Sequence, residues 1–158
     1  MTEPRDTAGV IAPPPLIYLG FLLAGWGLSK VLGAPDDLGL EPQVRRVAAF
    51  VLIVAGLLVE GSAANQFRRA GTRVEPWKPT TALSTDGLYR LSRNPIYVGF
   101  TLMYLGFATA MDSWIAVAFL LPCLIVVDRF VVVREERYLA AKFGAEYDAY
   151  RARVRRWL

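Results

Sequence analysis

Histidine is absent from this chain of 158 residues, and cysteine occurs once, as Cys123. Without an imidazole there is no histidine general base, no histidine metal ligand and no Ser-His-Asp site. A single cysteine excludes an internal disulfide and a paired-cysteine metal or redox centre. Cys123 lies within an apolar run, where thiols are inert, and we expect it to be a core residue. The sequence therefore predicts no metal centre and no imidazole chemistry.

Apolar residues, by contrast, are abundant and come in long blocks. They make up 54% of the chain, and the mean hydropathy is +0.35. A soluble protein of this size has too little interior to hide such blocks. The same numbers exclude a disordered chain, which needs low hydropathy and high charge. The sequence predicts an integral membrane protein of the all-α class, a multi-pass helical bundle bound to the lipid bilayer.

Four blocks are long enough, or nearly so, for the ~20 helical residues that cross a bilayer. They cover residues 15–32, 47–64, 95–111 and 114–133, with a tight break between the last two at Asp112 and Ser113. The glycines Gly99 and Gly106 lie seven residues apart in the third block, which favours close helix packing. Pro122 is expected to kink the fourth helix.

Basic residues set the expected orientation. Six of the 18 lysines and arginines lie in residues 65–94 and eight lie from residue 129 onward. By the positive-inside rule both segments, and with them both termini, are expected on the cytoplasmic side. Residues 1–14 lack the basic start of a signal peptide, so we expect the first span to be retained. The charge of +4 then reflects topology and anionic lipids, and no nucleic-acid partner is expected.

An amphipathic pattern follows the fourth block. Apolar residues recur at spacings of three and four, at Leu139, Phe143, Tyr147, Tyr150, Val154 and Trp157, and arginines occupy the opposite face. This spacing predicts a C-terminal amphipathic helix, with an interruption at Gly144. Two roles are open: anchoring on the membrane surface, or a lid in which Tyr147 or Tyr150 lines a site.

The start of the third block is the first candidate for chemistry. Asn94 followed by Pro95 is typical of a helix N-cap and first helical residue. The positive end of the helix dipole would then bind carboxylates or phosphates, and the neighbouring Arg93 would add a two-pronged donor. The alternative is that Asn94 only starts the helix and Arg93 only anchors it to headgroups.

The end of the fourth block is the second candidate. Glu135 follows Asp128 by seven residues, two helical turns, and Glu136 follows Arg129 by the same distance. The spacing predicts an acidic stripe of Asp128 and Glu135, which suits a cationic or hydroxyl-rich ligand. A solvated, self-paired helix face is the alternative. Glu60, near the end of the second block, is either a site residue or a side chain that reaches the membrane boundary.

Several linked motifs resemble the isoprenylcysteine carboxyl methyltransferase and phospholipid methyltransferase family. They are RNPIYVG at 93–99, REE at 134–136 and FGAEY at 143–147, in that order. The resemblance covers about residues 65–158, and the first two spans match only as apolar helices. Eukaryotic and some other members have histidine where this chain has Asn94, so backbone contacts and capping survive while any imidazole role is lost.

The resemblance implies a membrane-embedded methyltransferase that uses S-adenosylmethionine, bound where the last helices reach the cytoplasm. Its implied catalytic residues are Arg93, Glu135 and Glu136. The cofactor-site candidates are Tyr89, Arg93, Asn94, Tyr97, Glu135, Glu136 and, from the lid, Tyr147. The implied division is a tail at 1–14, two spans at 15–64 and a catalytic region at 65–158. A prokaryotic inner membrane is the expected location.

The acceptor is expected to be amphiphilic, either like a prenyl-cysteine carboxylate or a lipid, and to enter sideways between helices. A carboxylate is nucleophilic without a base, whereas an ammonium must first lose a proton, for which Glu135 or Glu136 could serve. The lack of histidine favours the carboxylate, with Arg93 as an orienting cation. Two other functions remain open: a small four-helix transporter, prompted by Glu60 and Asp128, and a non-catalytic membrane scaffold acting through its basic tail.

Overall fold

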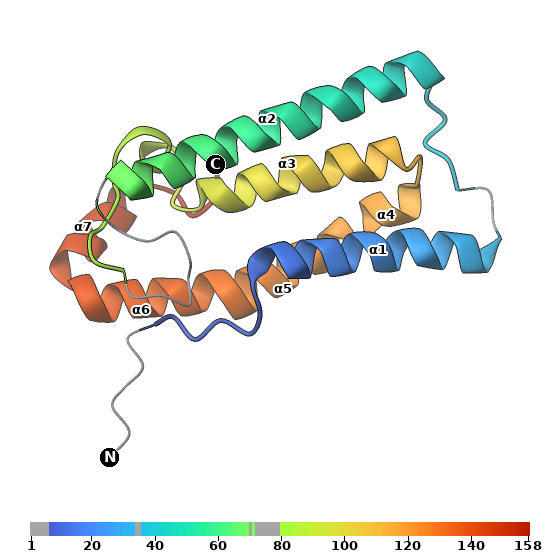
Figure 1. Cartoon of the computed structure of the whole chain (residues 1–158). Coiled ribbons are helices and arrows are strands. Elements are labelled where there is room, and N and C mark those ends of the chain that lie inside the picture. Colours follow the sequence, from blue (N-terminus) through green and yellow to red (C-terminus); the bar gives the residue numbers. More distant parts are fainter. Residues whose placement is uncertain (1–6, 34–35, 70, 72–79) are drawn as a thin grey trace.

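The computed structural model describes residues 7–33, 36–69, 71 and 80–158 (Figure 1). Three long helices lie roughly parallel: α1 (Pro14–Leu32), α2 (Pro42–Arg69) and α3 (Pro95–Ala110). A fourth rod is built from α4 (Trp114–Ala118), α5 (Leu120–Val127), the π-helical turn η2 (Asp128–Val132) and α6 (Val133–Phe143). The short 3-10 helix η1 (Gly87–Arg90) and α7 (Ala145–Arg153) lie at one end of the bundle. The predicted all-α, multi-pass bundle is confirmed.

Among the described residues, three helical stretches are long and apolar enough to cross a bilayer: Pro14–Leu32, Pro42–Arg69 and the fourth rod, Trp114–Phe143. The third predicted span, which corresponds to α3, is apolar but has 16 residues, about 24 Å of helix. The second helix is longer than the predicted 47–64. It begins five residues earlier because the Glu41 carboxylate accepts hydrogen bonds from the N–H groups of Gln43 and Val44, at 2.8 and 3.0 Å.

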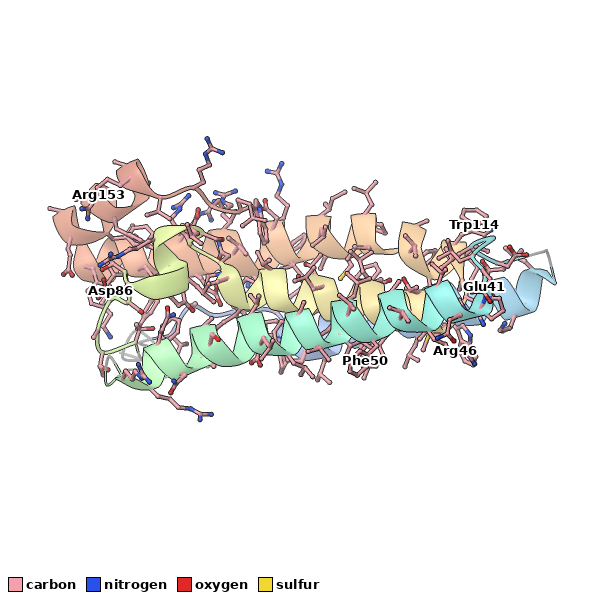
Figure 2. The ribbon with its side chains drawn as sticks, turned by 90° about the horizontal axis from the view of Figure 1, so that it is seen from above. Glu41, Arg46, Phe50, Asp86, Trp114 and Arg153 are labelled. Atoms are coloured by element: carbon pink, nitrogen blue, oxygen red, sulfur yellow. The ribbon has the colours of Figure 1, made fainter. Side chains whose placement is uncertain are left out.

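The two ends of the bundle carry the charged side chains. Figure 2 shows Asp86 and Arg153 at one end, Glu41 and Arg46 at the other, and Phe50 on the outer side of α2 between them. Phe50 is 68% exposed, as a side chain facing lipid would be. This distribution matches an apolar belt between two aqueous boundaries. Residues 1–6 and 72–79 of the predicted tail and loop lie outside the described residues.

The predicted break at Asp112 and Ser113 is present and is fixed by side chains. Asp112 has a positive φ of 55° and pairs with the guanidinium of Arg45 at the start of α2. The Ser113 hydroxyl accepts from the N–H of Ala116 at 3.0 Å, which caps α4, and donates to Asp36 at 2.6 Å. The chain therefore reverses here between α3 and α4.

The fourth rod is interrupted at two places. At Phe119 the α-helix breaks between α4 and α5, three residues before Pro122, because a proline has no N–H and its ring clashes with the carbonyl four residues earlier. The π-helical turn at Asp128–Val132 adds about one residue to the rod without advancing its axis. Residues beyond Val132 are thus rotated from where an unbroken α-helix would place them.

Glycines let α2 and α3 pack in backbone contact, as predicted for Gly99 and Gly106. A methyl group added at Gly106 would lie 2.6 Å from the Ile53 side chain and 3.0 Å from the Ala49 carbonyl oxygen. On the opposing helix, a methyl group at Gly56 would lie 2.7 Å from the Gly99 carbonyl oxygen. These are distances that real Cβ atoms do not adopt, so the contact requires small residues on both helices.

We expect Gly56→Ala to lower the stability of the bundle by about 1–3 kcal/mol, because overpacking forces the two helices apart. Gly61→Ala is the matched control, since Gly61 lies on the same helix with open space around it. Thermal unfolding in detergent micelles measures both. Equal unfolding midpoints for the two variants would contradict the proposed contact.

Candidate functional site

A cavity of about 260 Å³ lies at the end of the bundle that holds α6 and α7. It is walled by α2, the segment 80–84, η1, the first turns of α3, α6 and α7, with the two prolines that begin α1. All seven predicted site residues line it: Tyr89, Arg93, Asn94, Tyr97, Glu135, Glu136 and Tyr147. Glu60 and Tyr150, named in the sequence as weaker candidates, line it as well. The start of α3 and the end of the fourth rod thus share one cavity.

Glu135 and Tyr97 form a pair between α6 and α3. The Tyr97 hydroxyl donates to Glu135 Oε1 at 2.6 Å, and Tyr97 is only 6% exposed. No cation in the described residues pairs with Glu135. Its side chain is therefore held in place by a neutral hydroxyl and has no counter-ion among the described residues.

Glu136 is bound in the opposite way, by two guanidiniums. Its Oε1 lies 3.0 Å from Arg93 Nη1, and both its oxygens accept from the Arg156 fork, at 3.0 Å from Nε and 2.6 Å from Nη2. Arg156 also reaches Asp128, 3.3 Å away. A bidentate arginine–carboxylate pair is among the strongest polar contacts in proteins. Glu136 is thus neutralised and fixed.

This arrangement corrects the predicted acidic stripe. Asp128 shares a face with Glu136, through Arg156, and not with Glu135. The reason is the π-helical turn, which contains about one residue more than an α-helical turn. The residue that lies on the same face as Asp128 two turns later is therefore the eighth residue after it, Glu136, and not the seventh, Glu135. Glu135 is left facing the cavity and Tyr97.

The C-terminal tail is attached to the start of α3. The Arg93 N–H donates to the Arg155 carbonyl at 2.9 Å, and the Arg156 carbonyl accepts from Ser92 Oγ at 3.2 Å and Asn94 Nδ2 at 2.9 Å. Asn94 therefore occupies the predicted N-cap position, but its side chain does not cap the helix. Its amide is used instead to hold the tail, which is a correction to the sequence interpretation.

Two tyrosines of α7 cover the cavity. The predicted interruption at Gly144 is present, with φ of 50°, and it turns α7 back over η1. The Tyr150 hydroxyl donates to the Tyr89 carbonyl at 2.8 Å, and the Tyr147 hydroxyl accepts from Arg93 Nη1 at 3.2 Å. Burial raises the pKa of Tyr150, so its hydroxyl stays protonated. Tyr147 and Tyr150 thus both line the cavity, as the lid role requires.

Comparison with known proteins identifies the family of the chain. The sequence profile of the phospholipid methyltransferase family matches residues 44–146, which span α2 to the start of α7. The chain belongs to the phospholipid methyltransferase family. Membership of this family, together with the long apolar helices, supports a methyltransferase of the membrane.

Two relatives share parts of the chain. An uncharacterized protein of Haemophilus influenzae is 35% identical over 63 residues, which are 40% of this chain and all of that protein. A protein-S-isoprenylcysteine O-methyltransferase of Schizosaccharomyces pombe is 36% identical over 74 residues. That alignment covers 46% of this chain and 30% of the yeast protein.

Several residues of this candidate site were not predicted from the sequence. Arg156 was read only as part of a basic helix face, because nothing local distinguishes it from Arg153 or Arg155. The apolar part of the lining was missed as well: Pro14, Pro15, Phe67, Ala82, Leu83, Ile96, Phe100 and Leu139. So were three polar residues, Thr80, Ser84 and Tyr138. Only the first turn of α3 offered a signal, since Ile96 and Phe100 flank a predicted site residue.

We expect Arg156→Ala to lower the unfolding midpoint by roughly 4–8 °C, since losing hydrogen bonds between charged groups costs about 2 kcal/mol. The matched control is Arg155→Ala, because the exposed Arg155 side chain has no ion pair among the described residues. Its change should stay within about 0.5 kcal/mol. Thermal unfolding in detergent compares the two variants. An equally small effect of both would show that the ion pair between Arg156 and Glu136 adds no stability.

Proposed function

We propose that the chain is an S-adenosylmethionine-dependent methyltransferase that methylates the polar head of an amphiphilic acceptor at the membrane boundary. The observation that carries the proposal is the shared cavity. It gathers all seven residues that were predicted from the sequence, from η1, the start of α3, α6 and α7. Family membership supports the methyl transfer, and the yeast relative's name supports an acceptor with a lipid-like tail.

The residues present suit the proposed cofactor. Arg93 Nε is buried and has no hydrogen-bond partner among the described residues, so it is a donor left over for a ligand carboxylate. Glu135 would accept from hydroxyl or ammonium groups, and the tyrosine rings of the lining offer faces on which a purine can stack. When bound, S-adenosylmethionine supplies a methyl group on a positively charged sulfur.

The protein's contribution is alignment and the exclusion of water. A sulfonium already provides a good leaving group, so the chain must mainly hold donor and acceptor in line. The tyrosines of α7 cover the cavity and the apolar side chains of the lining keep it dry. A carboxylate acceptor needs no base. For an amine acceptor, Glu135 would take the proton, because Glu136 is committed to two arginines.

The cavity also suits an acceptor with an apolar tail. Phe67, Ile96, Phe100 and Leu139 line it beside the charged groups. The apolar helices would keep the tail in the bilayer while the head meets the water-soluble cofactor. The transporter alternative was prompted by two acids, Glu60 and Asp128. Asp128 no longer supports it, because its carboxylate is paired with Arg156.

We expect the purified full chain in detergent to bind tritiated S-adenosylmethionine saturably. Glu135→Gln and Glu136→Gln should each weaken binding about tenfold or more. The first removes a carboxyl group that faces the cavity, and the second removes the carboxylate that fixes Arg93 and Arg156. The control is Glu146→Gln, an exposed acid on α7. Circular dichroism confirms the fold of each variant. A folded wild-type chain that binds no cofactor would refute the proposed function.

Tyr97→Phe tests the pair inside the cavity. The variant keeps the ring but removes the 2.6 Å hydrogen bond that orients Glu135. We expect cofactor affinity to fall by about three- to tenfold, less than in Glu135→Gln, since the carboxylate remains but is free to rotate. The same binding measurement decides the matter, and an unchanged affinity would mean that Tyr97 does not position Glu135.

A further inference from the structure

Glu60 is a third carboxylate of the cavity, and it comes from the wall opposite α6. It lies on α2, nine residues before the helix ends at Arg69, about 13 Å along its axis. The residue is partly buried and lines the cavity. A methyl group added at Gly99 would lie 2.8 Å from Glu60 Cβ, so α2 meets the first turns of α3 at this residue.

Glu60 differs from the other acids of this region in its partners. Asp128 and Glu136 are paired with arginine, and Glu135 accepts from Tyr97. Within the described part of the chain, Glu60 has no hydrogen bond and no ion pair. It nevertheless lies on a helix whose composition is that of a membrane span.

The charge balance of the cavity is therefore uneven. Its described lining holds three carboxylates, those of Glu60, Glu135 and Glu136, against the single guanidinium of Arg93. Arg93 and Arg156 already neutralise Glu136. Two carboxylates on facing helices remain without a cation. Carboxylates at membrane depth are costly and repel each other, unless a positive charge lies between them.

We propose that Glu60 is the counter-ion of a cationic group, an ammonium or a sulfonium, on a small molecule bound in the cavity. This inference rests on the proposed function, which provides two sources of such a group. The cofactor carries both an ammonium and a sulfonium, and an amine acceptor carries an ammonium. A neutral hydroxyl would satisfy hydrogen bonding but would leave the Glu60 carboxylate without a counter-charge. Glu60 thereby becomes a binding residue that the family motifs did not include.

The experiment compares Glu60→Gln with wild type, using the full chain in lipid nanodiscs and four small-molecule probes. S-adenosylmethionine and S-adenosylhomocysteine share the ammonium, but only the first has a sulfonium. Dodecylamine and dodecanol differ only in the head group, and their binding is measured as the shift in unfolding midpoint that each causes. Glu60→Asp keeps the charge, and Glu146→Gln removes an exposed acid at the same end of the bundle.

Three outcomes support the inference and identify the cation. Affinity for S-adenosylmethionine alone falls about tenfold if Glu60 faces the sulfonium. Affinity for both nucleosides falls equally if it faces the cofactor's ammonium. Only the stabilisation by dodecylamine is lost if it faces the acceptor. In each case Glu60→Asp stays within about threefold of wild type and Glu146→Gln is unchanged.

One outcome overturns the inference. If folded Glu60→Gln binds S-adenosylmethionine, S-adenosylhomocysteine and dodecylamine within twofold of wild type, while Glu135→Gln loses the cofactor, the proposed function stands and Glu60 is not a counter-ion. A wild-type chain that binds neither nucleoside is a different result, because it refutes the proposed function itself. Thermal unfolding without ligand shows whether Glu60→Gln is folded. If it is not, the binding of Glu60→Asp is compared with that of wild type instead.

Discussion

The shared carboxylate of Glu136 is the contact on which the rest of the site depends. A lone carboxylate at the end of an apolar helix would be costly, and two guanidiniums remove that cost, Arg93 from the start of α3 and Arg156 from the tail. Because Arg156 is fixed by its side chain and its carbonyl together, the tail cannot swing free of α3. Fixing the tail in turn places α7, and with it Tyr147 and Tyr150, over the cavity. One ion-pair cluster therefore sets the positions of three separate elements.

The same cluster divides the acids of the region into two groups. Asp128 and Glu136 are satisfied by arginine and act as structure. Glu135 and Glu60 lie on facing walls of the cavity and have no cationic partner among the described residues. The π-helical turn brings about this division, because it rotates α6 so that Glu136 meets Arg156 while Glu135 meets Tyr97. An unbroken α-helix would have put Asp128 and Glu135 on one face, with no arginine able to separate their roles.

This register is also where sequence reasoning failed. The hydrophobic blocks predicted the helices, Gly99 and Gly106 predicted close helix packing, and Gly144 predicted the interruption before α7. These features could be predicted because each depends on local composition or periodicity. The family resemblance, together with the amphipathic C-terminal pattern, predicted the seven site residues. A π-helical turn has no sequence signature, since its extra residue is stabilised by tertiary contacts. Arg156 could not be singled out either, because its role comes from a fold-back that joins it to residues 20 and more positions away. The periodicity of a helix does not indicate which distant residues its side chains will pair with.

Helix packing and the chemistry of the cavity are coupled through Gly99. The absent side chain there lets α2 approach α3 closely enough for Glu60 to reach the first turns of α3, which also carry Tyr97. A larger residue at Gly99 would separate the helices and move Glu60 away from the cavity. The small residues of this contact therefore do more than hold two membrane helices together, because they also set how near Glu60 lies to Glu135 and its partner Tyr97 across the cavity. Because that distance governs their attraction for a cation, the packing of the apolar belt determines the electrostatics at its boundary.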